Sequence, residues 1–95
     1  MTDKTELLEA LESALKSKEI PYFHAVVSEN SRGRYVLSVR LKSVHAEVVA
    51  EMFRDLTNFS YIATSSYKRN ACTEVQTFIR SSVYLTGAAA WFRTL

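Results

Sequence analysis

The chain is expected to fold as an α+β domain in which helices pack on one face of an antiparallel sheet. Two periodicities support this. Residues 3–18 and 44–57 repeat apolar side chains at the spacing of amphipathic helices. Residues 34–42 instead alternate, with Tyr35, Leu37, Val39 and Leu41 on one side, as in a strand with one buried face. We therefore predict the order α-β-β-α-β-β with a short C-terminal helix, and four strands in the sheet.

Composition and length are those of one compact domain spanning residues 1–95. Of the 95 residues, 47% are apolar and 23% are charged, which is enough hydrophobic material for a core. The polar N-terminus does not resemble a signal peptide, and no apolar run approaches the roughly 18–20 residues that span a membrane. A lone cysteine, Cys72, fits a reducing compartment. We therefore expect a cytoplasmic protein without a membrane partner.

The first helix, 3–18, has clear end signals. Asp3 is a suitable N-cap, and Glu6 follows three residues later in a capping-box arrangement. Pro21 cannot continue a helix and favours an extended residue before it. The chain should therefore leave this helix and enter a strand.

A β-hairpin is predicted next, with strands 22–28 and 34–42 joined by a polar loop at 29–33. Phe23, Ala25 and Val27 are expected to face the core. The opposite face of the first strand would carry Tyr22, His24 and Val26. This hairpin supplies half of the predicted sheet.

The second half begins with Ser43 as the N-cap of helix 44–57, whose apolar stripe starts at Val48. A third strand is expected over 59–67, followed by a turn.

The segment 72–86 has two interpretations. As a strand it aligns Val75, Thr77 and Ile79, whereas as a helix it begins with a Thr73–Gln76 capping box. The abundance of β-branched and aromatic residues favours the strand. A helical 72–86, with a three-stranded sheet, is the alternative. Gly87 would end the strand before a final helix at 88–95.

Charge is modest but uneven along the chain. The formal net charge is +2 and the isoelectric point is near 8.8. Most acids lie in the two predicted helices, whereas half of the cations lie in or beside the predicted strands. This distribution predicts an acidic helical side and a more basic sheet side, which permits a nucleic-acid partner without requiring one.

No motif for catalysis or cofactor binding is found. His24, His45 and Cys72 match no zinc spacing, and no paired carboxylates, nucleophile elbow, phosphate loop or dinucleotide fingerprint occurs. We expect no enzymatic activity, no metal and no cofactor.

The remaining candidate site is the open face of the sheet, opposite the helices. Aromatic and arginine side chains on such a face stack bases in several RNA and single-strand binders. The same residue types are enriched at protein interfaces, and an ordinary half-solvated face is the third interpretation. The predicted contact group is Tyr22, His24, Arg40, Tyr67, Lys68, Arg69 and Arg80.

By elimination, the sequence predicts a small non-enzymatic module that binds another protein, with self-association as a further option. A small, compact chain without catalytic motifs, tails or disulfides also fits a phage or mobile-element inhibitor of a host protein complex. The alternative function is nucleic-acid binding through the same basic and aromatic face.

Overall fold

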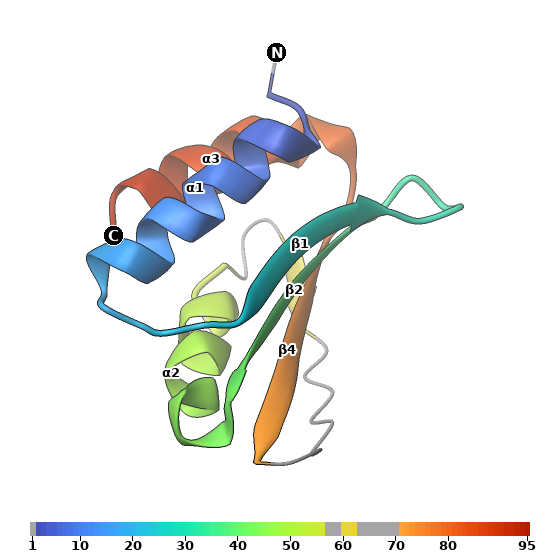
Figure 1. Ribbon diagram of the computed structural model, residues 1–95. Helices are drawn as coiled ribbons and strands as arrows, with labels where there is room; N and C mark the ends of the chain where they lie inside the picture. Colours follow the sequence, from blue (N-terminus) through green and yellow to red (C-terminus); the bar gives the residue numbers. More distant parts are fainter. Residues whose placement is uncertain (1, 57–59, 63–70) are drawn as a thin grey trace.

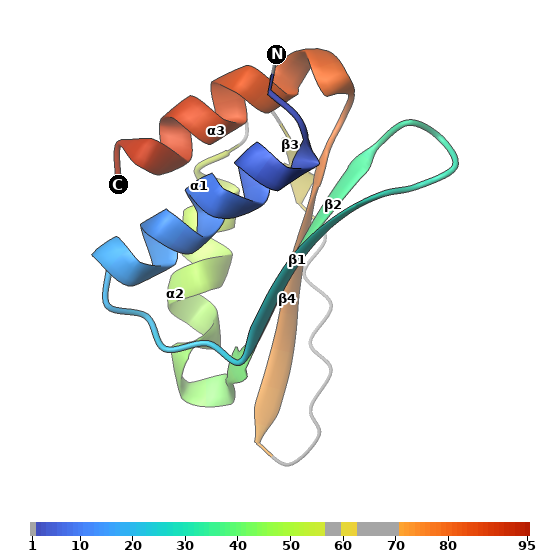
Figure 2. The same cartoon turned by 45° about the horizontal axis from the view of Figure 1, so that its top comes forward.

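The computed structural model describes residues 2–56, 60–62 and 71–95, and its α+β class with an antiparallel sheet confirms the prediction. The elements are α1 (Lys4–Ser17), β1 (His24–Glu29), β2 (Tyr35–Lys42), α2 (Ser43–Arg54), β3 (Ser60–Ile62), β4 (Cys72–Ile79), a 3₁₀ turn at Ser82–Tyr84 and α3 (Leu85–Arg93). All three helices lie on one side of the sheet (Figures 1 and 2).

The sheet consists of three long strands, β1, β2 and β4, with the three-residue β3 beyond β4. Every neighbouring pair is antiparallel, and the spatial order is β1-β2-β4-β3. The expected third strand, 59–67, is described only at 60–62, and its other residues lie outside the described part of the chain. A full-length fourth strand therefore stays a prediction.

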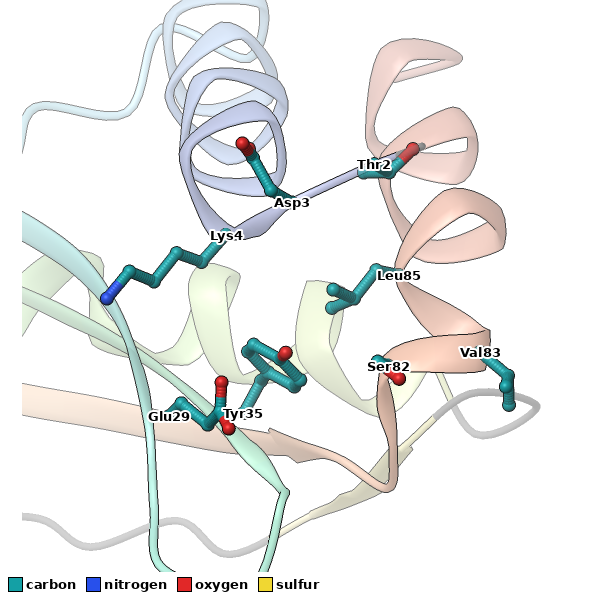
Figure 3. Close-up of a pocket in the computed structure, with 8 residues that line it drawn as sticks. All are labelled: Thr2, Asp3, Lys4, Glu29, Tyr35, Ser82, Val83 and Leu85. Atoms are coloured by element: carbon teal, nitrogen blue, oxygen red, sulfur yellow. The ribbon is translucent and has the colours of Figure 1, made fainter.

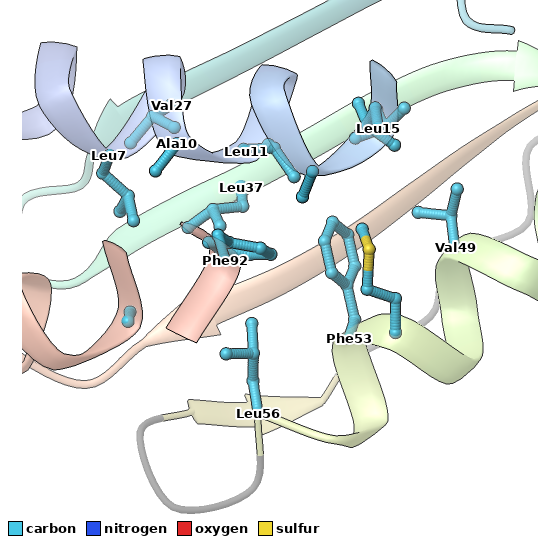
Figure 4. Packing of buried hydrophobic residues seen from close by; sticks show 14 of the residues in the cluster. Leu7, Ala10, Leu11, Leu15, Val27, Leu37, Val49, Phe53, Leu56 and Phe92 are labelled. Carbon is cyan, nitrogen blue, oxygen red and sulfur yellow. The ribbon is translucent and has the colours of Figure 1, made fainter. Parts of the chain in front are cut away.

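The core fills the space between the sheet and the helices (Figure 4). Phe53 of α2 and Phe92 of α3 meet edge to face with ring centroids 6.5 Å apart. Small residues on both α1 and α3 let these two helices pack closely side by side. The fully buried large side chains are Phe53, Phe92, Leu7, Leu11, Leu15, Leu37, Leu41, Leu56, Ile79, Leu85, Val39 and Val49.

Both ends of α1 follow from local chemistry. The Asp3 carboxylate accepts a hydrogen bond of 2.9 Å from the Glu6 amide, which confirms the predicted cap. At the other end, Glu19 adopts a φ of 57°, and the Ile20 amide donates to the Leu15 carbonyl. This pattern is a Schellman ending with glutamate at the position that glycine usually occupies.

The second helix starts one residue earlier than expected. Lys42 occupies the N-cap position, and Ser43 is the first helical residue. The Ser43 hydroxyl lies 2.7 Å from the Thr73 hydroxyl instead of capping the helix. The predicted stripe also included Val48, but that side chain is 48% exposed. The buried face instead runs through Val49, Ala50, Met52 and Phe53.

The segment 72–86 is a strand only as far as Ile79, so both interpretations were partly wrong. Beyond that point, Leu85, Ala88, Ala89 and Phe92 are buried at helical spacing, which explains why α3 begins at Leu85. A continued strand would have aligned Leu85 with Val83, which is 77% exposed. Gly87 lies inside α3 and ends no strand.

Candidate interaction surfaces

The open face of the sheet is built from cross-strand rows. The first row runs His24–Arg40–Glu74, the second Val26–Ser38–Gln76 and the third Ser28–Val36–Phe78. In the described part of the chain, every helix packs on the other face. The register therefore brings β1, β2 and β4 side chains together on a surface that the helices leave open.

A polar cluster lies around Glu74 on this face. Its Oε1 accepts hydrogen bonds from the Ser38 hydroxyl at 2.6 Å and from the side-chain amide of Gln76, through Nε2, at 2.8 Å. The Arg40 guanidinium lies 3.5 Å from Oε2. The Ser38 bond is the main cause that holds the pKa of Glu74 below its ordinary value, against the opposing effect of burial.

The cluster changes the charge expected for this face. Arg40 was predicted as a cation available to a partner, but its charge is largely offset by the Glu74 carboxylate. A phosphate group approaching the row His24–Arg40–Glu74 would also meet that carboxylate. The described part of the face is consequently less basic than the strand sequence alone indicates.

The predicted contact residues are only partly brought together. His24 and Arg40 are direct cross-strand neighbours, as expected. Arg80 lies just past the end of β4, with its guanidinium carbon 5.3 Å from the centre of the Tyr84 ring. The tip residues Tyr67, Lys68 and Arg69 lie outside the described residues.

The placement of Tyr22 on the open face was wrong. Its ring packs against the core, and its hydroxyl donates a 2.8 Å hydrogen bond to the Glu12 carboxylate of α1. Burial and this bond raise the pKa of Tyr22. The reason is that β1 begins at His24, so Tyr22 precedes the regular alternation of the strand.

An apolar surface that the sequence did not reveal lies where β1 begins and β2 ends. The Phe23 side chain is 59% exposed and that of Val44 is 78% exposed. Together they border a shallow hollow of about 390 Å³. We call this surface the Phe23 patch; its lining residues are Phe23, Lys42, Ser43, Val44, Ala71 and Cys72.

The Phe23 patch arises from two local departures from regular structure. The Phe23 amide donates to the Arg40 carbonyl at 2.8 Å, whereas His24 is the residue in register with Arg40. This irregularity separates Phe23 from the inward alternation of Ala25 and Val27. Val44 lies in the first turn of α2, outside the buried face of that helix. In the sequence, the adjacent aromatic residues Tyr22 and Phe23 indicate that one of the two lies outside the core, because adjacent residues of an extended chain cannot both face it.

A second hollow, of about 380 Å³, lies between the start of α1 and the turn before α3 (Figure 3). Tyr35 and Leu85 line it, and several of its polar groups already have partners. Asp3 caps α1, and the Tyr35 hydroxyl bonds to Glu29, which adds to burial in raising the pKa of Tyr35. Figure 3 shows Val83 pointing away from the other lining residues. The Asp3 and Tyr35 side chains are therefore already engaged within the chain.

Across residues 2–56, 60–62 and 71–95, no three His, Cys, Asp or Glu side chains gather as metal ligands would. None of the helices in these ranges is both long and apolar enough to cross a membrane. Comparison with protein-family models, curated proteins and solved structures gives no match.

Proposed function

We propose that this chain is a small non-enzymatic module that binds another protein through the Phe23 patch. The observation that carries the proposal is the exposure of Phe23 and Val44 around a concave surface. Fully burying such a side chain is worth about 1.5–3 kcal/mol. A partner that covers both side chains removes them from water, and this stabilises the complex. Contiguous exposed apolar side chains of this kind mark interaction sites more often than isolated ones.

The composition of the patch indicates what its partner presents. Phe23, Val44 and Ala71 offer an apolar surface for a partner's apolar side chain. Lys42 is the charged residue among the described residues that line the hollow, and it is exposed. A carboxylate beside the partner's apolar side chain would therefore be complementary to Lys42. The partner is accordingly a protein segment with an apolar anchor and a neighbouring acid.

Photo-crosslinking in the native cell tests the proposal. In one variant a photoreactive phenylalanine analogue replaces Phe23. In a second variant it replaces Tyr84, which lies beyond the end of β4 that is far from the patch. The proposal expects a discrete protein adduct from position 23 that is absent from position 84. The adduct is identified by mass spectrometry, and the purified partner is then titrated by calorimetry.

The titration compares matched substitutions. Phe23→Ser and Val44→Ser should each weaken binding about tenfold or more, as hot-spot truncations do. Val83→Ser is the control, because Val83 is 77% exposed and Val44 is 78% exposed. Equal affinity of all three variants would show that the patch is not the binding surface.

The inhibitory role and the nucleic-acid alternative stay predictions. The carboxylate of Glu74, in the row His24–Arg40–Glu74 of the open face, favours the protein-binding hypothesis over nucleic-acid binding. Fluorescence anisotropy with a labelled oligonucleotide at two salt concentrations discriminates the two, because phosphate contacts weaken steeply as salt rises.

A further inference from the structure

The outer edge of β1 carries backbone groups that no described strand uses. The Asn30 amide donates to the Arg34 carbonyl at 2.8 Å, which fixes the hydrogen-bonding phase of the hairpin. In the observed register, His24, Val26 and Ser28 then direct their amides and carbonyls toward β2. The corresponding groups of Ala25, Val27 and Glu29 point away from the sheet.

No described strand pairs with this side of β1. The strand stands at one end of the order β1-β2-β4-β3. In both Figure 1 and Figure 2, β1 lies in front of β2 and β4, and no described segment passes in front of it. Val26 on the open face is 37% exposed. The edge is therefore accessible to an added strand.

The edge also lacks the features that usually prevent strand addition. Natural edge strands are protected by lysine, proline, inward charges or bulges along their length. The segment His24–Glu29 contains no lysine, arginine or proline, and its carboxylate, Glu29, stands at the last position. Its Ala-Val-Val centre suits pairing with another extended chain.

We infer that β1 pairs antiparallel with β1 of a second copy of this chain, joining two sheets across a two-fold axis. With the axis at Val27, all the outward groups of Ala25, Val27 and Glu29 are hydrogen-bonded, because Ala25 lies opposite Glu29 of the second copy and Val27 lies opposite Val27. This register does not bring the two Glu29 carboxylates face to face, so self-pairing meets no direct charge repulsion.

The strength of this dimer is limited by its size. A six-residue edge buries less than the roughly 1,200 Å² of a standard interface. We therefore expect weak, reversible association, with a dissociation constant of about 10 µM to 1 mM. This inference concerns a different surface from the Phe23 patch and does not depend on the proposed function.

Sedimentation equilibrium of the full chain, over a concentration series up to about 1 mM, measures the association directly. The expected result is a weight-average mass that rises toward that of a dimer. Val26→Lys should weaken association about tenfold or more, because it places a cation on each copy near the axis. Val44→Lys is the matched control on the Phe23 patch and should leave the association unchanged.

A second variant tests the backbone directly. Ala25→Pro removes an outward amide that no described strand uses, and should also abolish the association. Circular dichroism verifies that each variant is folded, and Val26→Lys decides the question if Ala25→Pro does not fold. A chain that is monomeric throughout the series overturns the inference. An association that Val44→Lys abolishes and Val26→Lys does not would overturn it equally.

Discussion

At the scale of single residues, Glu74 organises the open face of the sheet. It accepts hydrogen bonds from Ser38 and Gln76 and lies beside Arg40, so one carboxylate connects two strands. Ser38 is buried as a consequence, although it belongs to the face opposite the core. The hydroxyl is satisfied there because it donates a hydrogen bond to Glu74.

This cluster predicts a specific loss of stability in acid. The pKa of Glu74 is lowered in the folded state from its ordinary value of 4.5. The carboxylate therefore stabilises the fold above that pH, and the contribution is lost as the pH falls through the folded-state pKa. Urea unfolding of the wild type and Glu74→Gln should show a less stable variant near neutral pH, and the difference should shrink in acid. A difference independent of pH would contradict the role of the charge.

Glu19 carries a second prediction at this scale. Its φ of 57° is left-handed, which costs an L-residue roughly 1–2 kcal/mol. Glycine adopts this conformation without that cost but loses more backbone entropy on folding. We expect Glu19→Gly to raise the free energy of unfolding by about 0.5–1 kcal/mol, measured by urea denaturation. Glu9→Gly, inside α1, is the control and should lower it by about 1 kcal/mol.

The residues of the candidate surfaces were predictable where the strand alternation is regular. His24 and Arg40 follow it and lie together as expected. Tyr22 and Phe23 lie where the alternation begins, and a periodic pattern does not say which of two adjacent aromatic residues enters the core. That choice depends on Glu12 of α1, a different element, whose carboxylate accepts a hydrogen bond from the Tyr22 hydroxyl.

At the scale of elements, some ends of helices and strands are determined by neighbouring residues and others by contacts that are distant in sequence. The start of α1 was predictable because its cap and its first turn are adjacent in sequence. The end of β4 was not, because a strand and a helix both align several apolar residues of 72–86. Burial of Leu85 and Phe92 against α1 and α2 decides the structure, and these contacts are distant in sequence.

The contribution of α3 can be measured through Phe92. This side chain is completely buried, packs against Phe53 and lies beside Trp91. Phe92→Ala should lower the free energy of unfolding by about 3–5 kcal/mol, since it removes a large apolar group and leaves a cavity. Arg93→Ala, an exposed neighbour, should change it by less than about 0.5 kcal/mol. Equal effects of the two substitutions in urea denaturation would show that α3 is not anchored as described.

At the scale of the whole molecule, the two layers follow from the sequence but the interaction surfaces do not. Amphipathic helices and alternating strands require the apolar sides to meet, which placed the core correctly. The Phe23 patch forms where β1, β2, β4 and α2 come together at one end of the sheet. Its residues come from three separate stretches of the chain, 23, 42–44 and 71–72, so a local pattern indicates at most that one of Tyr22 and Phe23 is exposed and not that a patch forms.

The final prediction tests whether Phe23 and Val44 serve partner binding or stabilise the fold. Phe23 and Val44 are both more than half exposed, so most of their surface gains nothing from folding. The double substitution Phe23→Ser, Val44→Ser should therefore lower the free energy of unfolding by less than about 1 kcal/mol. It should also reduce the fluorescence of a bound hydrophobic dye, because the apolar surface available to the dye is smaller. A loss of about 3 kcal/mol or more in urea denaturation, comparable to Phe92→Ala, would instead show that the patch stabilises the fold. Any loss of partner binding would then reflect unfolding, whereas unchanged stability assigns the loss to the patch itself.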